Sequence, residues 1–264
     1  MKSAIVVIQE QIKYFYLIRR LSWYELKSKN KSNYLGIAWE VLNPCIQILI
    51  FWFVFGTINK RADVEVIPGM DVPFIGWLLG GFIIWNFFYQ ATIQGSKSIY
   101  TRLGMLSKMN FPMSVIPNFI MFSEFYVHLI MILITVILLQ FMGFFINIYY
   151  LQLFYFIFAT LALTFSIALI TSTLSTIIRD VHMLLNSILR MLLYLTPVLW
   201  PMTSMFSDKI LLLKVIKLNP LYYLTEGYRS SFFGTEWYFI DHWKYTLYFW
   251  VLVIVLFLLG STLH

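Results

Sequence analysis

Six stretches of this chain are apolar over enough positions to cross a bilayer as helices, which takes about 20 residues each. In chain order they cover about 34–58, 74–94, 113–142, 151–178, 181–199 and 244–264. The segment before the first of these stretches alternates apolar and basic positions. This pattern predicts an amphipathic helix over about 9–30 on the inner membrane surface, and a solvated tail is the alternative. The pattern predicts an all-α membrane protein with an interface helix in 1–33 and a six-helix transmembrane domain in 34–264.

Polar residues interrupt five of the six predicted spans, and they recur at helical spacing. In the first span Glu40, Asn43 and Gln47 stand at i, i+3 and i+7, and in the second Asn86 and Gln90 stand one turn apart. Residues at these spacings share one helix face. An ionisable residue at the centre of a membrane helix costs about 2.5–3.5 kcal/mol. These faces are therefore expected to point toward protein or toward water.

The third and fifth spans carry further ionisable groups, namely Glu124, His128 and Arg190, whereas the sixth has no polar face and is expected to contact lipid. Polar contacts that merely join helices are the alternative for each face, and a direct Glu40–Arg190 pair is a further one. Polar faces on five spans favour a transport bundle over a simple anchor. The predicted substrate pathway comprises Trp39, Glu40, Asn43, Gln47, Asn86, Gln90, Glu124, His128 and Arg190.

Composition agrees with a membrane protein, since 60% of the 264 residues are hydrophobic and only 12% are charged. The first 33 residues hold seven Lys and Arg against two Glu, and basic flanks stay on the cytoplasmic side, so the N-terminus is predicted inside. Residues 201–243 then fall outside yet are rather apolar, which predicts short re-entrant helices packed on protein. The 19% aromatic content fits an interfacial belt or a surface for stacking sugars.

Catalytic motifs are weak. The segment GSKS at 95–98 lacks the spacing of a phosphate-binding loop, so any ATP hydrolysis is assigned to another chain. Glu124 with His128, and Asp241 with His242, are readable as acid–base pairs, which keeps a membrane-embedded transferase as an alternative; an interior histidine is the simpler interpretation. The single cysteine, Cys45, excludes a disulfide framework.

Several short motifs occur in the order typical of one family. They are ELK at 25–27, YLG at 34–36, LNP at 42–44, FVFG at 53–56, RD at 179–180, TPV at 196–198, NPL at 219–221 and EGYR at 226–229. Together they cover nearly the whole chain. On these motifs the sequence resembles the ABC-2 type exporter permeases, with the nearest likeness to teichoic-acid permeases. Capsule and O-antigen permeases and small-molecule exporters of the same superfamily are the alternatives.

The resemblance implies a homodimer in the bacterial cytoplasmic membrane, with two copies of an ATPase subunit that bind ATP and Mg²⁺, while this chain binds no cofactor. The implied substrate is an anionic polysaccharide on a polyprenyl diphosphate. The residues implied to meet the diphosphate or lipid headgroups are Arg19, Arg20, Lys27, Lys29 and Lys31; positive-inside placement is the simpler explanation. Those implied to contact the ATPase are Tyr100, Arg102, Met105 and Lys108. The implied outer re-entrant motif comprises Asn219, Pro220, Glu226 and Arg229.

Overall fold

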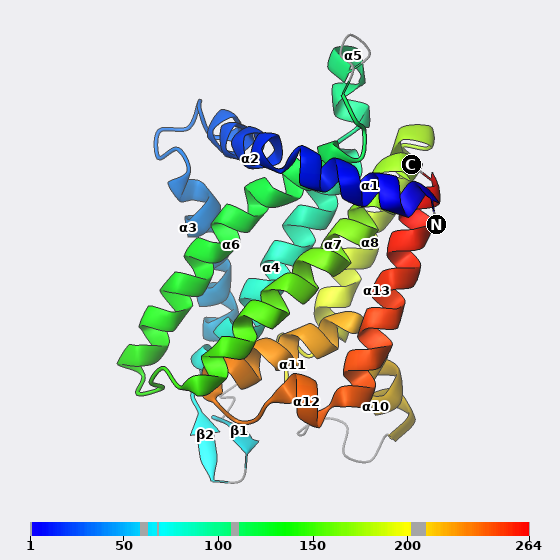
Figure 1. Cartoon of the computed structure of the whole chain (residues 1–264). Helices are drawn as coiled ribbons and strands as arrows, with labels where there is room; N and C mark the ends of the chain where they lie inside the picture. Colours follow the sequence, from blue (N-terminus) through cyan, green and yellow to red (C-terminus); the bar gives the residue numbers. More distant parts are fainter. Residues whose placement is uncertain (1, 59–62, 68, 107–110, 202–209, 264) are drawn as a thin grey trace.

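Helices form nearly all of the architecture. A computed structural model describes the chain except residues 1, 59–62, 68, 107–110, 202–209 and 264 (Figure 1). The elements are α1 Lys2–Lys13, α2 Phe15–Lys29, α3 Ala38–Phe51, η1 Trp52–Ile58, β1 Val64–Ile67, β2 Met70–Val72, α4 Phe74–Lys97, η2 Tyr100–Arg102, α5 Leu103–Leu106, α6 Val115–Phe141, η3 Ile148–Leu151, α7 Gln152–Ile177, α8 Asp180–Leu195, α10 Ile210–Lys217, α11 Pro220–Phe233, α12 Tyr238–Asp241 and α13 Trp243–Leu263.

Five helical stretches among the described residues are long and apolar enough to cross a membrane. They are α3 with its π-helical continuation η1, then α4, then α6, then η3 with α7, and finally α13. The predicted fifth span, α8, has only 16 residues and ends at Leu195. A residue before proline is disfavoured in helical conformation, and Thr196, which precedes Pro197, is extended with φ −82° and ψ 139°. The six predicted spans are thus five long helices and one shorter helix.

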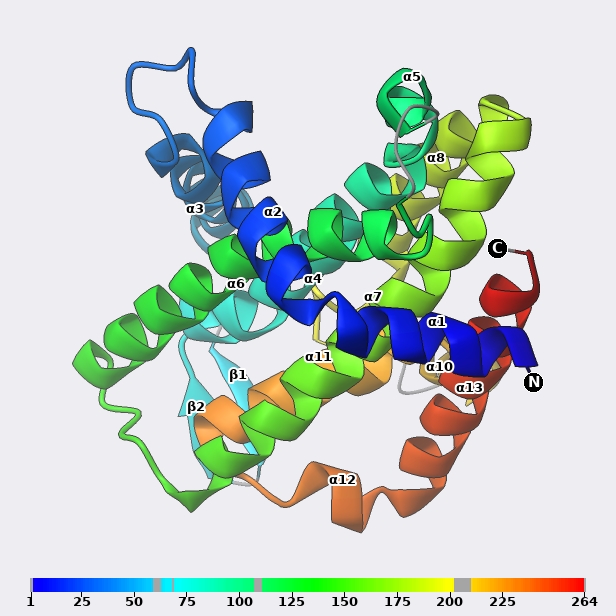
Figure 2. The same ribbon diagram turned by 45° about the horizontal axis from the view of Figure 1, so that its top comes forward.

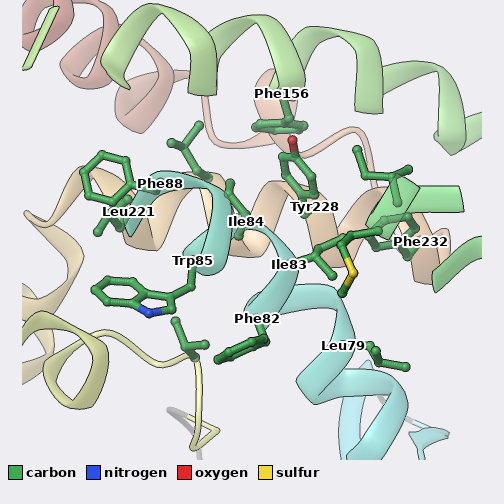
Figure 3. Packing of buried hydrophobic residues seen from close by; sticks show 14 of the residues in the cluster. Leu79, Phe82, Ile83, Ile84, Trp85, Phe88, Phe156, Leu221, Tyr228 and Phe232 are labelled. Atoms are coloured by element: carbon green, nitrogen blue, oxygen red, sulfur yellow. The ribbon is translucent and has the colours of Figure 1, made fainter. Parts of the chain in front are cut away.

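The helix α4 is the centre of the bundle. Within its most apolar stretch 78% of residues are buried inside the chain, against 11% for the Ala38–Ile58 span and 22% for α13. Figure 3 shows Tyr228 of α11 between Phe156 of α7 and the Ile83–Ile84 part of α4, with Phe82 on the other side of α4. Apolar side chains on most of its circumference explain this central place. The low burial of α13 agrees with its prediction as a lipid-facing helix.

Two helices, α1 and α2, run across one end of the bundle (Figures 1 and 2). The sequence predicted one helix over 9–30; instead helix begins at Lys2 and is interrupted at Tyr14, where φ is −100° and ψ is 12°. The interruption lets each half bury its own apolar residues, including Ala4 of α1 and Ile18 of α2. The Nδ2 of Asn118 on α6 donates to Oε1 of Gln11 at 2.7 Å, which ties α1 to the bundle.

The opposite end carries a β-hairpin and the helices α10 to α12 (Figure 1). The sequence pattern predicted no element between the first two spans, but β1 and β2 lie there as an antiparallel pair with Val64 opposite Val72. The helix α11 begins at a standard cap, because the Asn219 side chain accepts the N–H of Leu221 at 3.0 Å. It ends at Gly234, whose φ of +69° suits glycine. Most of α11 is buried, as expected of a short helix packed on protein.

Candidate functional site

A cavity of about 370 Å³ lies between α3, α4 and α8, and we call it the amide cavity. Its lining residues are Gln47, Phe51, Phe82, Trp85, Asn86, Tyr89, Gln90, Arg190, Leu193 and Tyr194. Four of the residues predicted for a substrate pathway, from three separate helices, therefore meet at one surface. None of the lining residues is acidic, so Arg190 gives the cavity a positive character.

The wall of the amide cavity combines a fixed aromatic part with unpaired polar groups. Trp85 and Tyr89 lie one turn apart on α4 with ring centroids 6.2 Å apart and planes at 29°. The Tyr89 hydroxyl donates to Oδ1 of Asn186 on α8 at 2.7 Å. Within the described part of the chain, the side chains of Gln47, Asn86, Gln90 and Arg190 have no hydrogen-bond or ion-pair partner. Their donors and acceptors are available to a ligand.

A second cavity, of about 410 Å³, lies where α2 crosses α4 and α6, and we call it the charged cavity. Its lining residues are Glu25, Lys29, Gln94, Lys97, Thr101, Arg102, Ile120, Ser123 and Glu124. It brings Lys29, Arg102 and Glu124 of the predicted sites together. Two of its cations are already paired, because Lys29 contacts Glu124 and Arg102 contacts Glu25.

Lys29 joins three helices through ion pairs. Its Nζ lies 3.0 Å from Oε1 of Glu40 on α3 and 3.2 Å from Oε1 of Glu124 on α6. Asn30 adds a hydrogen bond from its Nδ2 to Oε1 of Glu40 at 3.0 Å. Burial lowers the pKa of Lys29, but the two carboxylates outweigh burial and raise its pKa above the ordinary 10.5. Glu40 thus pairs with Lys29, and the alternative Glu40–Arg190 pair is wrong.

The other predicted pathway residues lie apart from both cavities. Trp39 and Asn43 are exposed on α3. His128 is buried between α6 and α11, where its Nε2 lies 2.9 Å from the Tyr228 hydroxyl and its ring stacks on Phe87 at 4.7 Å. This arrangement is that of an interior histidine, the simpler of the two interpretations given to it.

The basic residues of the N-terminal segment are divided by the fold. All five residues are exposed at least in part, and Lys29 alone among them lines a described cavity. Lys29 is the last residue of α2, where that helix meets α3 and α6. Headgroup contacts remain a prediction for Arg19, Arg20, Lys27 and Lys31.

The segment predicted to face an ATPase is tied to two helices of the bundle. Arg102 of η2 pairs with Glu25 of α2, and the Tyr100 ring lies 6.3 Å from the His182 ring at the start of α8. The Nδ1 of His182 also lies 2.7 Å from the Ser96 hydroxyl on α4. Met105 belongs to α5, and Lys108 lies outside the described residues.

Three of the outer motifs converge on one polar contact network, which we call the outer hub. Asn219 donates from Nδ2 to the Thr196 hydroxyl at 2.8 Å, and Pro220 opens α11. The buried Arg229 guanidinium donates to the Pro197 carbonyl at 2.8 Å and to Glu226 at 2.7 Å. The outer hub therefore connects α11 to the extended segment after α8.

Arg229 also contacts α4. Its guanidinium carbon lies 3.5 Å from the centroid of the Trp77 ring, close enough for a strong cation–π interaction. Gly81 permits this approach, because a Cβ there would lie 2.5 Å from Nη2 of Arg229. The sequence motifs indicated Arg229 but not its partner Trp77.

Sequence reasoning also missed Lys97, Glu25 and Trp85 as cavity residues. The spacing of Asn86, Gln90 and Gln94 points along one face of α4, and continuing it by three residues leads to Lys97. Within the described residues, no group of three or more His, Cys, Asp or Glu is placed to hold a metal ion.

Comparison with known proteins assigns this arrangement to a class. Residues 16–233 match the family described as ABC-2 type transporter. The chain belongs to the ABC-2 type transporter family. Members are membrane permease subunits, so the all-α membrane fold and the prediction of a non-catalytic permease are both confirmed. ATP hydrolysis in this class belongs to a separate subunit.

Among its relatives in curated collections are permeases of one named system. The chain is 25% identical over 235 residues to "O-antigen export system permease protein RfbA" of Myxococcus xanthus, covering 86% of this chain and 84% of the relative. A Klebsiella pneumoniae protein of the same name is 26% identical over 209 residues, covering 79% of this chain and 76% of the relative.

Proposed function

We propose that this ABC-2 permease exports a polysaccharide, and that the polymer passes along the amide cavity. Sugar hydroxyls both donate and accept hydrogen bonds, as do the free amides of Gln47, Asn86 and Gln90. The Trp85–Tyr89 pair offers a broad aromatic surface for sugar C–H groups. A site for apolar drugs would be lined mainly by apolar groups, so the amides favour a carbohydrate. The names of the relatives support the same substrate class.

A second copy of the chain closes the amide cavity into a passage in this proposal. The helices on either side of it expose apolar residues, such as Leu49 of α3, Phe53 of its continuation η1, and Met191 of α8. Extended exposed apolar surface marks contact with lipid or with another protein. A homodimer would cover part of this surface and place two amide cavities face to face.

The end of the bundle that carries α1 and α2 faces the cytoplasm in this proposal, and with it η2 and α5. The helix α5 projects beyond α2 (Figure 1), so an ATPase subunit approaching from that side would meet it first. Tyr100, Arg102 and Met105 belong to this surface. One ATPase subunit per permease would bind ATP and Mg²⁺, while the permease chain binds no cofactor.

The proposed substrate is an O-antigen-type polysaccharide on a lipid diphosphate anchor, because that system is named for the relatives described above. Teichoic acid, which the sequence motifs resemble, is the second candidate. In either case the charged cavity is the proposed place for the anchor, since Lys97 has no ion-pair partner among the described residues and lies beside the paired cations Lys29 and Arg102. A diphosphate attracts such cations strongly.

The test is export in cells lacking the native gene, complemented with variants. The double variant Asn86→Leu with Gln90→Leu should reduce surface polysaccharide at least about ten-fold, because two unmatched polar contacts per sugar cost more than 1.4 kcal/mol. Thr262→Leu, on the exposed end of α13, is the matched control and should export normally. Normal export by the double variant, at equal membrane abundance, would reject the amide cavity as the passage.

A further inference from the structure

We infer that Arg190 makes the amide cavity selective for polysaccharides that carry an anionic group, a carboxylate or a phosphate, in their repeating unit. This inference deepens the proposed function and depends on it. The family resemblance implies an anionic polymer, and this inference names the residue that would discriminate an anionic repeating unit from a neutral one.

The position of Arg190 is set by contacts elsewhere on α8. Asn186 precedes it by four residues and therefore lies on the same helix face. The hydrogen bond from Tyr89 to Asn186, 2.7 Å long, fixes that face against α4. Arg190 consequently lines the amide cavity together with Gln47 and Asn86.

The charge of Arg190 has no counter-ion within the described residues. No carboxylate is among the residues that line the cavity, and the nearest acidic residue along α8, Asp180, stands ten positions away, about 15 Å along a helix. The acidic residues Glu40 and Glu124 are engaged by Lys29. Arg190 is exposed within the single chain and lines the amide cavity without a partner, so an anionic ligand can pair with its guanidinium through charge-assisted hydrogen bonds without breaking an existing ion pair.

The chemistry of the surroundings fits an acidic sugar better than a free anion. The planar guanidinium binds a carboxylate or phosphate through two parallel hydrogen bonds. The amides of Gln47, Asn86 and Gln90 lie in the same wall for the neutral hydroxyls of the ring. The Trp85–Tyr89 pair supplies an apolar face. Each part of an anionic saccharide therefore has a partner in one cavity.

The test uses the complex of this permease with its ATPase subunit in nanodiscs and three hexasaccharide probes: a neutral glucan, a galacturonan with carboxylates, and a glucan linked by phosphodiesters. Dissociation constants are measured by calorimetry. The wild-type complex should bind at least one anionic probe about ten-fold more tightly than the neutral one, because two parallel hydrogen bonds to a charged guanidinium are stronger than hydrogen bonds between neutral groups. Comparing the two anionic probes distinguishes a carboxylate from a phosphate as the preferred group.

Three variants make the result specific to Arg190. Arg190→Gln should bind all three probes equally, and Arg190→Lys should keep part of the preference, since it retains charge without the planar fork. Arg179→Gln removes an exposed cation at the start of the same helix, outside the amide cavity, and should keep the full preference. Raising the salt concentration should weaken binding of the anionic probes only.

Two results separate failure of this inference from failure of the proposed function. If the neutral probe binds as tightly as both anionic probes, or if Arg190→Gln keeps the preference, the selectivity role of Arg190 is refuted while carbohydrate binding stands. If no probe binds the wild-type complex, polysaccharide recognition by this cavity is itself refuted.

Discussion

Replacing Arg229 by methionine tests whether the outer hub holds together the end of the permease that carries α11. Methionine has a similar length and is apolar, so the variant removes the charge and donors with little change in volume. The Arg229 side chain is only 2% exposed, and it donates to Glu226 and to the carbonyls of Pro197 and Val198, at 2.7, 2.8 and 3.3 Å. All three acceptors lose their partner in the variant.

The expected cost follows from these contacts. Removing one member of a buried ion pair costs about 3–5 kcal/mol, mainly because the remaining charge stays desolvated. Glu226 is 29% exposed, so water restores part of its solvation and favours the lower half of that range. The carbonyls left without a donor and the lost contact with Trp77 add to the cost. We expect a loss of about 3–4 kcal/mol in the free energy of unfolding.

The assay is thermal unfolding of the chain in nanodiscs, where about 2–4 °C accompanies each kcal/mol for a chain of this size. Arg229→Met should lower Tm by roughly 6–16 °C, and Arg229→Lys should lower it less, because charge and one donor remain. Lys214→Met, an exposed cation on α10, is the control and should stay near wild type. A Tm of Arg229→Met equal to that of the control would refute the role of the outer hub.

Three further predictions concern packing and the end of the bundle that carries α1 and α2. Gly227→Ala should lower Tm strongly, because the new Cβ would lie 2.1 Å from the buried Phe156 ring; an unchanged Tm would contradict this packing. Glu25→Arg and Arg102→Glu should each impair ATP-driven export, and the double variant should restore it, because the ion pair is kept with its charges exchanged. Failure of the double variant to restore export would argue against coupling through this pair. Because the pKa of Lys29 is raised in the folded chain, its ion pairs should stabilise the fold fully below pH 10.5 and progressively less at higher pH. Tm measured across that pH range should therefore fall in the wild type by an amount that a Lys29→Met variant does not show.

The transferase alternative was based on two acid–base pairs, Glu124 with His128 and Asp241 with His242. The structure gives Glu124 and His128 other partners, Lys29 and Tyr228, and it places the two pairs at opposite ends of the bundle, so they cannot form one site. Glu124 contacts Lys29 near the end of the bundle crossed by α2. Asp241 and His242 lie at the other end, beside α12 (Figure 1), where the His242 ring stacks on Tyr238 at 4.4 Å. Residues at opposite ends of membrane-length helices cannot act on one substrate atom.

Periodicity and hydropathy defined most of the architecture of this permease. The apolar stretches located the long helices, and the spacing of Asn86 and Gln90 on α4 and of Gln47 on α3 indicated faces that do meet at the amide cavity. These inferences succeed because a membrane helix satisfies its own backbone hydrogen bonds. Its existence and its polar face therefore depend on nearby residues alone. The β-hairpin after η1 and the division between α1 and α2 escaped because short elements give weak periodic signals.

Only the tertiary structure decided which partner each charged group has. From the sequence, Glu40 had Arg190 as a candidate partner, yet Lys29 approaches it from the helix before, together with Glu124 from far along the chain. Likewise the orientation of α11 brings Arg229 to Trp77 and to the carbonyl of Pro197. The sequence motifs did not define that orientation. Ion pairs and cavities depend on distances between helices that are remote in sequence. Such distances are set by how side chains of different helices pack, and that packing is a property of the whole fold.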